Sequence, residues 1–123
     1  MKDEERCAPT DLKVRTKDFA LRIIHLYAAL PKTTVAQVIG KQLLRSATSV
    51  GAHYREGYRS RSTAEFVSKL EVGLQELEET LYWLELIVEA DIFSEERMKQ
   101  ILQEANELTA ILTTCVKNAK QKM

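Results

Sequence analysis

Apolar residues recur along most of the chain at spacings of three, four and seven, which is the period of a helix with one buried face. The first such stretch predicts a helix over residues 11–30. Its apolar positions are Leu12, Phe19, Ile23, Leu26, Tyr27 and Leu30. Pro31 ends this helix, because proline disfavours helical geometry at the preceding residue and has no N–H to donate. Thr33 or Thr34 then caps a second helix over residues 34–59.

Two further helices are marked by their capping residues. Ser62 and Glu65 form a capping box in which each side chain satisfies a free backbone N–H, and this begins a helix over residues 63–90. Its apolar stripe comprises Phe66, Leu70, Gly73, Leu74, Leu77, Leu81, Leu84 and Val88. Ser94 caps a last helix over residues 95–119, with Phe93 and Met98 placed for a hydrophobic staple.

Four long helices joined by short connections predict an all-α fold, an antiparallel up-down-up-down four-helix bundle. We expect residues 1–123 to form a single domain. The predicted core comprises Phe19, Ile23, Leu43, Val50, Phe66, Leu70, Leu77, Leu81, Leu84, Ile101, Leu108 and Leu112. The chain begins without the apolar segment of a signal peptide, and no apolar run approaches the roughly 18 residues of a membrane span. We therefore expect a cytoplasmic protein with no membrane partner.

Charge is distributed unevenly although the formal net charge is zero. Residues 32–61 carry six basic residues and one acid, whereas residues 62–96 carry one basic residue and ten acids. The second predicted helix is also rich in small residues, among them Ser46, Ser49, Gly51 and Ala52. Because such residues lower helix propensity, they indicate the close approach either of another helix or of another subunit.

The sequence offers little for an enzyme. A di-metal site in a four-helix bundle needs Glu-x-x-His motifs, and neither His25 nor His53 follows a glutamate by three positions. Cys7 lies in a polar N-terminal segment and Cys115 on an apolar helix face, so we expect two reduced cysteines and no catalytic thiol. A glycine-rich phosphate loop is also missing. We expect no catalytic activity, no metal and no cofactor.

Arg55, Arg59 and Arg61 alternate with Tyr54 and Tyr58 at the end of the second predicted helix. This pattern is consistent with phosphate contacts combined with base stacking. On these residues alone, however, it is more typical of a solvated helix terminus, whose cations favour the negative end of the dipole. Lys41 joins the three arginines as a candidate nucleic-acid ligand, and Lys117, Lys120 and Lys122 are placed to assist them.

Several short motifs occur in a recognisable order. They are Leu30-Pro31-Lys32, Gln42-Leu-x-Arg45-Ser46, Ser49, Gly51-Ala52, Arg55-Glu56, Phe66 through Leu74-x-Glu76, and Glu79-x-x-x-Trp83-Leu84-Glu85. Over residues 12–112 the chain resembles the four-helix-bundle proteins related to the bacterial ribosomal-RNA intervening-sequence protein. His53 departs from the asparagine usual in that pattern, so a hydrogen bond made there would become pH-sensitive.

The resemblance implies a ring-shaped homopentamer. We expect the subunit interface to include Arg45, Ser46, Ser49, His53, Glu56, Glu76, Glu79 and Trp83. Some members of that family are encoded within intervening sequences of large-subunit ribosomal RNA genes. A related member, the accessory protein of diversity-generating retroelements, binds nucleic acid and a reverse transcriptase. RNA, DNA and a partner protein such as a reverse transcriptase are therefore candidate partners.

Two hypotheses of function remain open. In the first, the protein is a ring that binds nucleic acid through Lys41, Arg55, Arg59 and Arg61. In the second, it is a protein-only oligomeric adaptor or scaffold. Its basic second helix would then pack against the acidic third helix of a neighbouring subunit.

Overall fold

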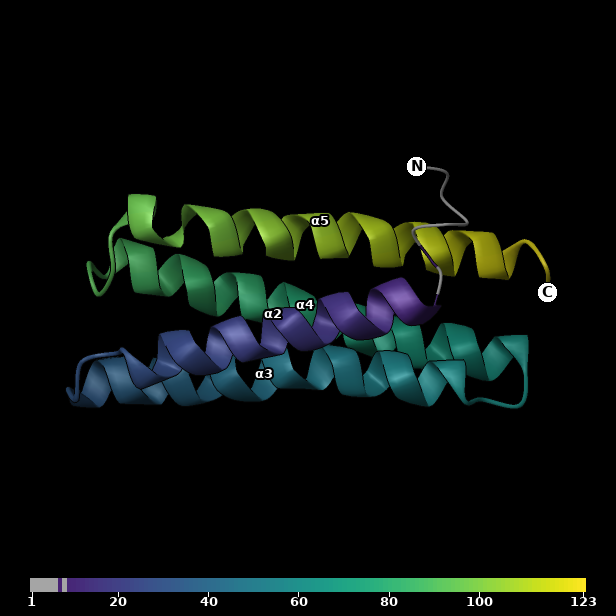
Figure 1. The fold of residues 1–123 in the computed structure, drawn as a ribbon, viewed down its shortest axis with the longest axis horizontal. Helices are drawn as coiled ribbons and strands as arrows, with labels where there is room; N and C mark the ends of the chain where they lie inside the picture. The colour runs from purple at the N-terminus through teal and green to yellow at the C-terminus, as the bar shows by residue number, and fades with distance from the viewer. Residues whose placement is uncertain (1–6, 8) are drawn as a thin grey trace.

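The protein is a bundle of four long helices (Figure 1). A computed structural model describes residue 7 and residues 9–123. The helices are α2 (Pro9–Ala28), α3 (Thr34–Tyr58), α4 (Thr63–Glu89) and α5 (Glu95–Lys120), and the described residues include no strand. These helices run up and down along one long axis, which confirms the predicted all-α four-helix bundle (Figure 1). The predicted helix ends lie within two residues of the observed ones.

Each of α3, α4 and α5 begins at the side-chain cap that the sequence indicates. Thr33 accepts a hydrogen bond from the Ala36 N–H, Ser62 from the Glu65 N–H, and Ser94 from the Arg97 N–H. The Glu65 carboxylate accepts the N–H of Arg61 at 2.9 Å, one residue before the cap. These bonds satisfy N–H groups that have no partner inside the helix, and so they fix where each helix starts.

The predicted core is buried with two exceptions. Ten of its twelve residues are at most 6 % exposed, including Phe19, Leu77 and Leu108. Phe66 and Leu81 are only half-buried and pack against the core from its edge, so the prediction that both are core residues holds only in part. Phe66 lies in the first turn of α4 at the end of the bundle, where fewer helices surround it.

Close packing of α2 on α3 explains the small residues in the middle of α3. A Cβ atom added at Gly51 would lie 3.0 Å from Thr16 Oγ1, tighter than ordinary van der Waals contact. At Gly51, therefore, the small residue is explained by the close approach of another helix of the same chain.

α2 packs less extensively against α5 than against α3. A group of ion pairs centred on Arg15, called here the clamp, joins α2 to α5. Arg15 Nε lies 2.9 Å from Glu104 Oε2, and Arg15 Nη2 lies 2.8 Å from Glu104 Oε1. Glu107 adds a third contact to the same guanidinium at 3.1 Å. Such a bidentate pair fixes the position of two helices more firmly than a single surface ion pair.

A disulfide joins Cys7 to Cys115, with the two Cα atoms 5.7 Å apart. The prediction of two reduced cysteines was therefore wrong. The chain enters α2 at the end of the bundle where α5 finishes, so residues that are 108 positions apart in sequence become neighbours. This bond ties the segment before α2 to the last helix.

Candidate nucleic-acid and assembly surfaces

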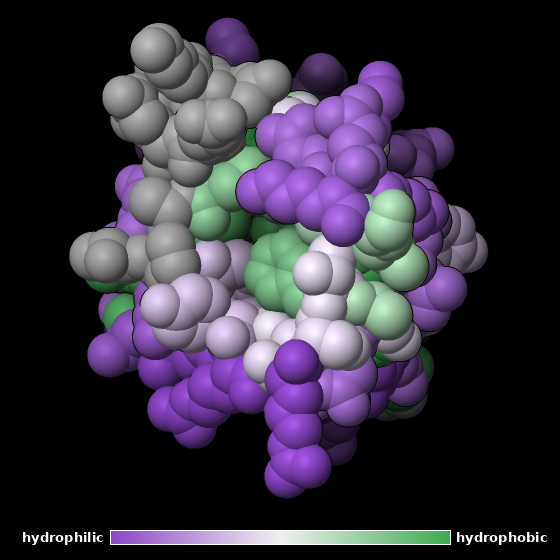
Figure 2. Space-filling view, turned by 90° about the vertical axis from the view of Figure 1, so that its right-hand side faces the viewer, coloured by the Kyte–Doolittle hydropathy of each residue, from purple (hydrophilic) through white to green (hydrophobic). Residues whose placement is uncertain are grey.

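Positive charge gathers at one end of the bundle. This basic end consists of residues 11–13, 55–71 and 117–122, which contribute eight lysines and arginines and four carboxylates. The cations are Lys13, Arg55, Arg59, Arg61, Lys69, Lys117, Lys120 and Lys122. Viewed end-on, hydrophilic side chains surround a hollow with a more hydrophobic floor (Figure 2).

The three candidate arginines of the basic end are exposed, and none pairs with a carboxylate among the described residues. Lys41 is exposed as well, but it lies 14 residues before Arg55, which is about 21 Å along the helix. The structure therefore brings Arg55, Arg59 and Arg61 to one end and leaves Lys41 apart from them.

The two interleaved tyrosines differ in their surroundings. Tyr58 is 47 % exposed, and Lys13 Nζ lies 4.5 Å from the centre of its ring. Tyr54 is only 2 % exposed, and burial raises the pKa of its hydroxyl to about 12. Tyr58 is therefore available for stacking on the ring face that Lys13 does not cover, whereas Tyr54 belongs to the core.

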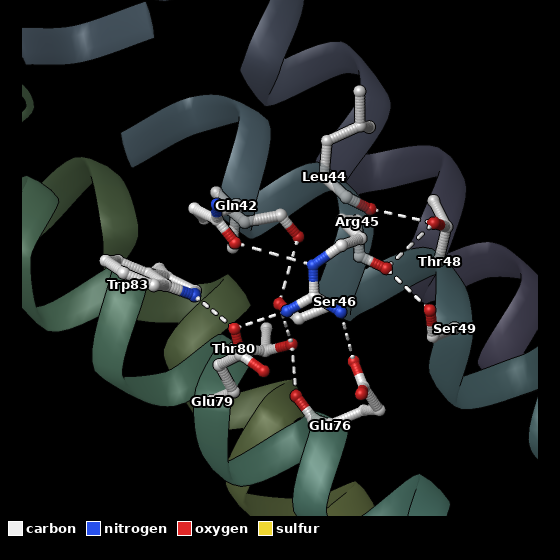
Figure 3. Close-up of polar contacts among 11 residues, drawn as sticks. Gln42, Leu44, Arg45, Ser46, Thr48, Ser49, Glu76, Glu79, Thr80 and Trp83 are labelled. Carbon is white, nitrogen blue, oxygen red and sulfur yellow. Dashed lines mark hydrogen bonds and ion pairs between the residues drawn. The ribbon is translucent and has the colours of Figure 1, made fainter. Parts of the chain in front are cut away.

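Arg45 links α3 to α4 at the middle of the bundle (Figure 3). Its Nη1 lies 3.1 Å from Glu76 Oε2, and its Nη2 pairs with Glu79. Trp83 Nε1 donates to the same Glu79 carboxylate at 3.2 Å. The hydrogen bond from Arg45, more than that from Trp83, holds the pKa of Glu79 below its usual value.

The hydroxyls around Arg45 also bond within the chain. Ser46 is fully buried, and its Oγ lies 2.9 Å from Thr80 Oγ1 on α4 (Figure 3). Ser49 donates to the Arg45 carbonyl at 2.7 Å. The predicted interface set thus contains a layer that joins α3 to α4 inside one bundle, and Ser46 lies within that layer.

His53 lies near a second ion pair between the same helices. Lys69 Nζ is 3.0 Å from Glu56 Oε2, and this hydrogen bond is the main reason that the pKa of Glu56 lies below its usual value. His53 Nδ1 is 3.6 Å from Glu56 Oε1, which is too long for a hydrogen bond. This buried nitrogen has no hydrogen-bond partner among the described residues.

Two apolar patches lie on the sides of the bundle. The first, called here the α2 patch, comprises Val14, Leu21 and Ile24, each at least 42 % exposed. The second, called the α4 patch, is Tyr82 with Trp83, whose ring centres are 5.1 Å apart in an edge-on arrangement. Tyr82 is 53 % exposed. Because α2 and α4 each pack between α3 and α5, they occupy diagonal corners, so these patches face different ways.

The sequence interpretation missed the α2 patch. The signal was present, since Val14 and Leu21 are seven residues apart and Ile24 follows three later, which places them on one helix face. That face is distinct from the one carrying Leu12, Phe19 and Ile23, so the helix carries two apolar faces and buries one. An unburied apolar face is typical of a contact with another protein.

The described residues contain no group of three His, Cys, Asp or Glu side chains able to hold a metal ion. None of the described helices is both long enough and apolar enough to cross a bilayer.

The architecture is similar to that of a protein whose structure has been solved. A crystal structure of a protein of unknown function from the S23 ribosomal protein family of Bacteroides thetaiotaomicron VPI-5482 is 37 % identical in sequence. The match covers 86 % of this chain and 98 % of that one, with a TM-score of 0.81. No curated protein matches the chain. Residues 10–114 match the sequence pattern of the 23S rRNA-intervening sequence proteins, and the chain belongs to that family.

Proposed function

We propose that the protein is a non-enzymatic homo-oligomeric ring, a pentamer as the family resemblance implies, that binds nucleic acid through the basic end of each bundle. The observation that carries this proposal is the separation of two kinds of surface. The two apolar patches lie on the sides of the bundle, whereas Arg55, Arg59 and Arg61 lie at its end, exposed and without a carboxylate partner among the described residues. Assembly and nucleic-acid binding can therefore use different surfaces.

The two apolar patches suit a head-to-tail contact. A closed ring requires each subunit to present two different, complementary surfaces. The α2 patch and the α4 patch differ in composition and face different ways.

Ring symmetry would place the basic ends together. When bundles related by one rotation axis stand side by side along that axis, their corresponding ends lie on the same face of the ring. Arg55, Arg59 and Arg61 are then repeated around that face, and many weak phosphate contacts add through avidity. A zero net charge does not prevent such binding, because phosphates respond to the local field.

Assembly is tested by light scattering on purified protein. The wild type should have a mass about five times that of the 14.1 kDa chain. Ile24→Asp should dissociate it, because the exposed apolar side chain would become a charge buried in the interface. Arg22→Asp, at an exposed position on the same helix, is the matched control. A wild-type monomer at micromolar concentration would overturn the ring.

Nucleic-acid binding is tested by anisotropy with a structured RNA and a duplex DNA at two salt concentrations. The triple variant Arg55→Ala/Arg59→Ala/Arg61→Ala should bind duplex DNA more weakly and reduce the slope of log affinity against log salt by up to about 2.7, at about 0.9 for each lost phosphate contact. Its matched control, Arg22→Ala/Arg97→Ala/Lys99→Ala, removes three exposed cations far from the basic end. Equal loss in both variants would contradict a localised site.

The second candidate function is the protein-only adaptor. It is favoured by the strong charge complementarity between residues 32–61 and residues 62–96. If the assembled wild type binds neither nucleic acid at low salt, these charges serve assembly alone. The adaptor then becomes the better hypothesis.

A further inference from the structure

A cavity of about 550 Å³ opens at the basic end of the bundle. It lies where the end of α3, the start of α4 and the end of α5 meet, and it corresponds to the hollow in the end-on view (Figure 2). Its volume falls within the range of small-molecule and cofactor sites, roughly 300–1,000 Å³. The size is therefore that of a site for one small organic ligand.

The cavity has an apolar, aromatic portion. Tyr58 and Phe66 contribute their rings, and the Cys7–Cys115 disulfide lines it as well. Phe66 is only half-buried because one side of its side chain faces this cavity and is not covered by a helix. Exposed aromatic rings in a concave site bind planar apolar groups by stacking.

The remaining lining is cationic and polar. Arg61 and Lys122 are both exposed, and neither side chain pairs with a carboxylate in the part of the chain that the structure describes. Asn118 supplies an amide that can both donate and accept. The Glu65 carboxylate is engaged by the backbone N–H of Arg61, which leaves the Arg61 guanidinium available for an anion.

We propose that this cavity binds one phosphorylated nucleotide, the terminal or unpaired nucleotide of a strand held on the ring. The base contacts Tyr58 and Phe66, and the phosphate lies between Arg61 and Lys122. This inference rests on the proposed function for the source of the nucleotide. A planar aromatic group carrying negative charge is the ligand that satisfies both halves of the lining.

The direct test titrates the oxidised protein with adenosine monophosphate, followed by calorimetry and amide chemical shifts. Adenosine and inorganic phosphate should each bind at least about tenfold more weakly, since each lacks one half of the recognition. Lys122→Ala and Phe66→Leu should each weaken binding of the monophosphate by about tenfold. Lys99→Ala, which changes an exposed lysine at the opposite end of α5 from the cavity, should leave binding of the monophosphate unchanged.

Two nucleic-acid probes separate this inference from the proposed function. A 5′-phosphorylated single strand should lose affinity in Phe66→Leu, whereas a closed duplex with no unpaired nucleotide should not. If duplexes bind but adenosine monophosphate does not, the cavity proposal is wrong and the proposed function survives. If the monophosphate binds and no strand does, the cavity site stands and the proposed function fails. Inorganic phosphate binding as tightly as the monophosphate would overturn the role of the aromatic rings.

Discussion

Loss of the Cys7–Cys115 disulfide should destabilise the bundle strongly. The bond spans 108 residues, and closing a loop of this length in the unfolded chain removes about 16 cal/mol/K of entropy, or about 4.8 kcal/mol at 25 °C. An unfolding entropy of about 2.1 cal/mol/K per residue converts this into a fall in melting temperature of about 18 °C for a chain of this length. The effect is large because almost the whole chain lies inside the loop.

The assay is thermal unfolding followed by circular dichroism at 222 nm, with and without a thiol reductant. Cys7→Ser is the cleaner variant, because Cys7 precedes α2 and is half-exposed whereas Cys115 is buried in the core. The variant should melt like the reduced wild type and should not respond to reductant. Two thiols titrated in the denatured protein without reductant would show that the bond does not form. A variant melting within about 3 °C of the oxidised wild type would refute the entropic reasoning.

Three further predictions concern the core, alkaline stability and the α2–α5 contact. Leu77→Ala removes a fully buried side chain and should cost about 2–5 kcal/mol by urea unfolding, and a cost below about 1 kcal/mol would contradict its central position. Tyr54 has a pKa raised by burial to about 12, so its contribution to stability is complete below pH 10 and lost as pH rises towards 12. Tyr54→Phe should therefore reduce the loss of melting temperature over that interval, whereas Tyr82→Phe, at an exposed ring, should not. Arg15→Met leaves the partly buried Glu104 without its bidentate partner and should cost about 1–3 kcal/mol. Faster hydrogen exchange along α2 would accompany that loss, and unchanged exchange would contradict the clamp.

The helices were predictable because their signals are local. Ser62, Ser94 and Pro31 each act within a few residues, and the apolar period requires no knowledge of the partner helix. The Arg15–Glu104 clamp and the disulfide were not predicted, since each joins residues about a hundred positions apart. Their pairing depends on the position of α2 relative to α5 along the axis of the bundle, which no local sequence pattern specifies.

The candidate site was predictable in part. Arg45, Glu76 and Glu79 were expected together at a subunit interface, and the structure pairs them between α3 and α4 of one chain. Tyr54 lies four residues after Val50 on the same face of α3, so its helical phase already indicated burial rather than stacking. The end cavity could not be foreseen, because its lining comes from the ends of three different helices and from Cys7.

The zero net charge of the chain conceals a polarity that matters more for function than the total. Acidic residues concentrate along α4, where Glu76 and Glu79 neutralise Arg45 within the chain and others remain on the outer face. The basic end has four more cations than carboxylates, and two of its lysines, Lys69 and Lys120, are already paired. Among the described residues, three arginines and three lysines of this end have no carboxylate partner, and the planar guanidinium of arginine binds phosphate with two parallel hydrogen bonds. A bundle built this way can use the apolar patches on its sides for neighbouring subunits and keep its basic end free for an anionic polymer.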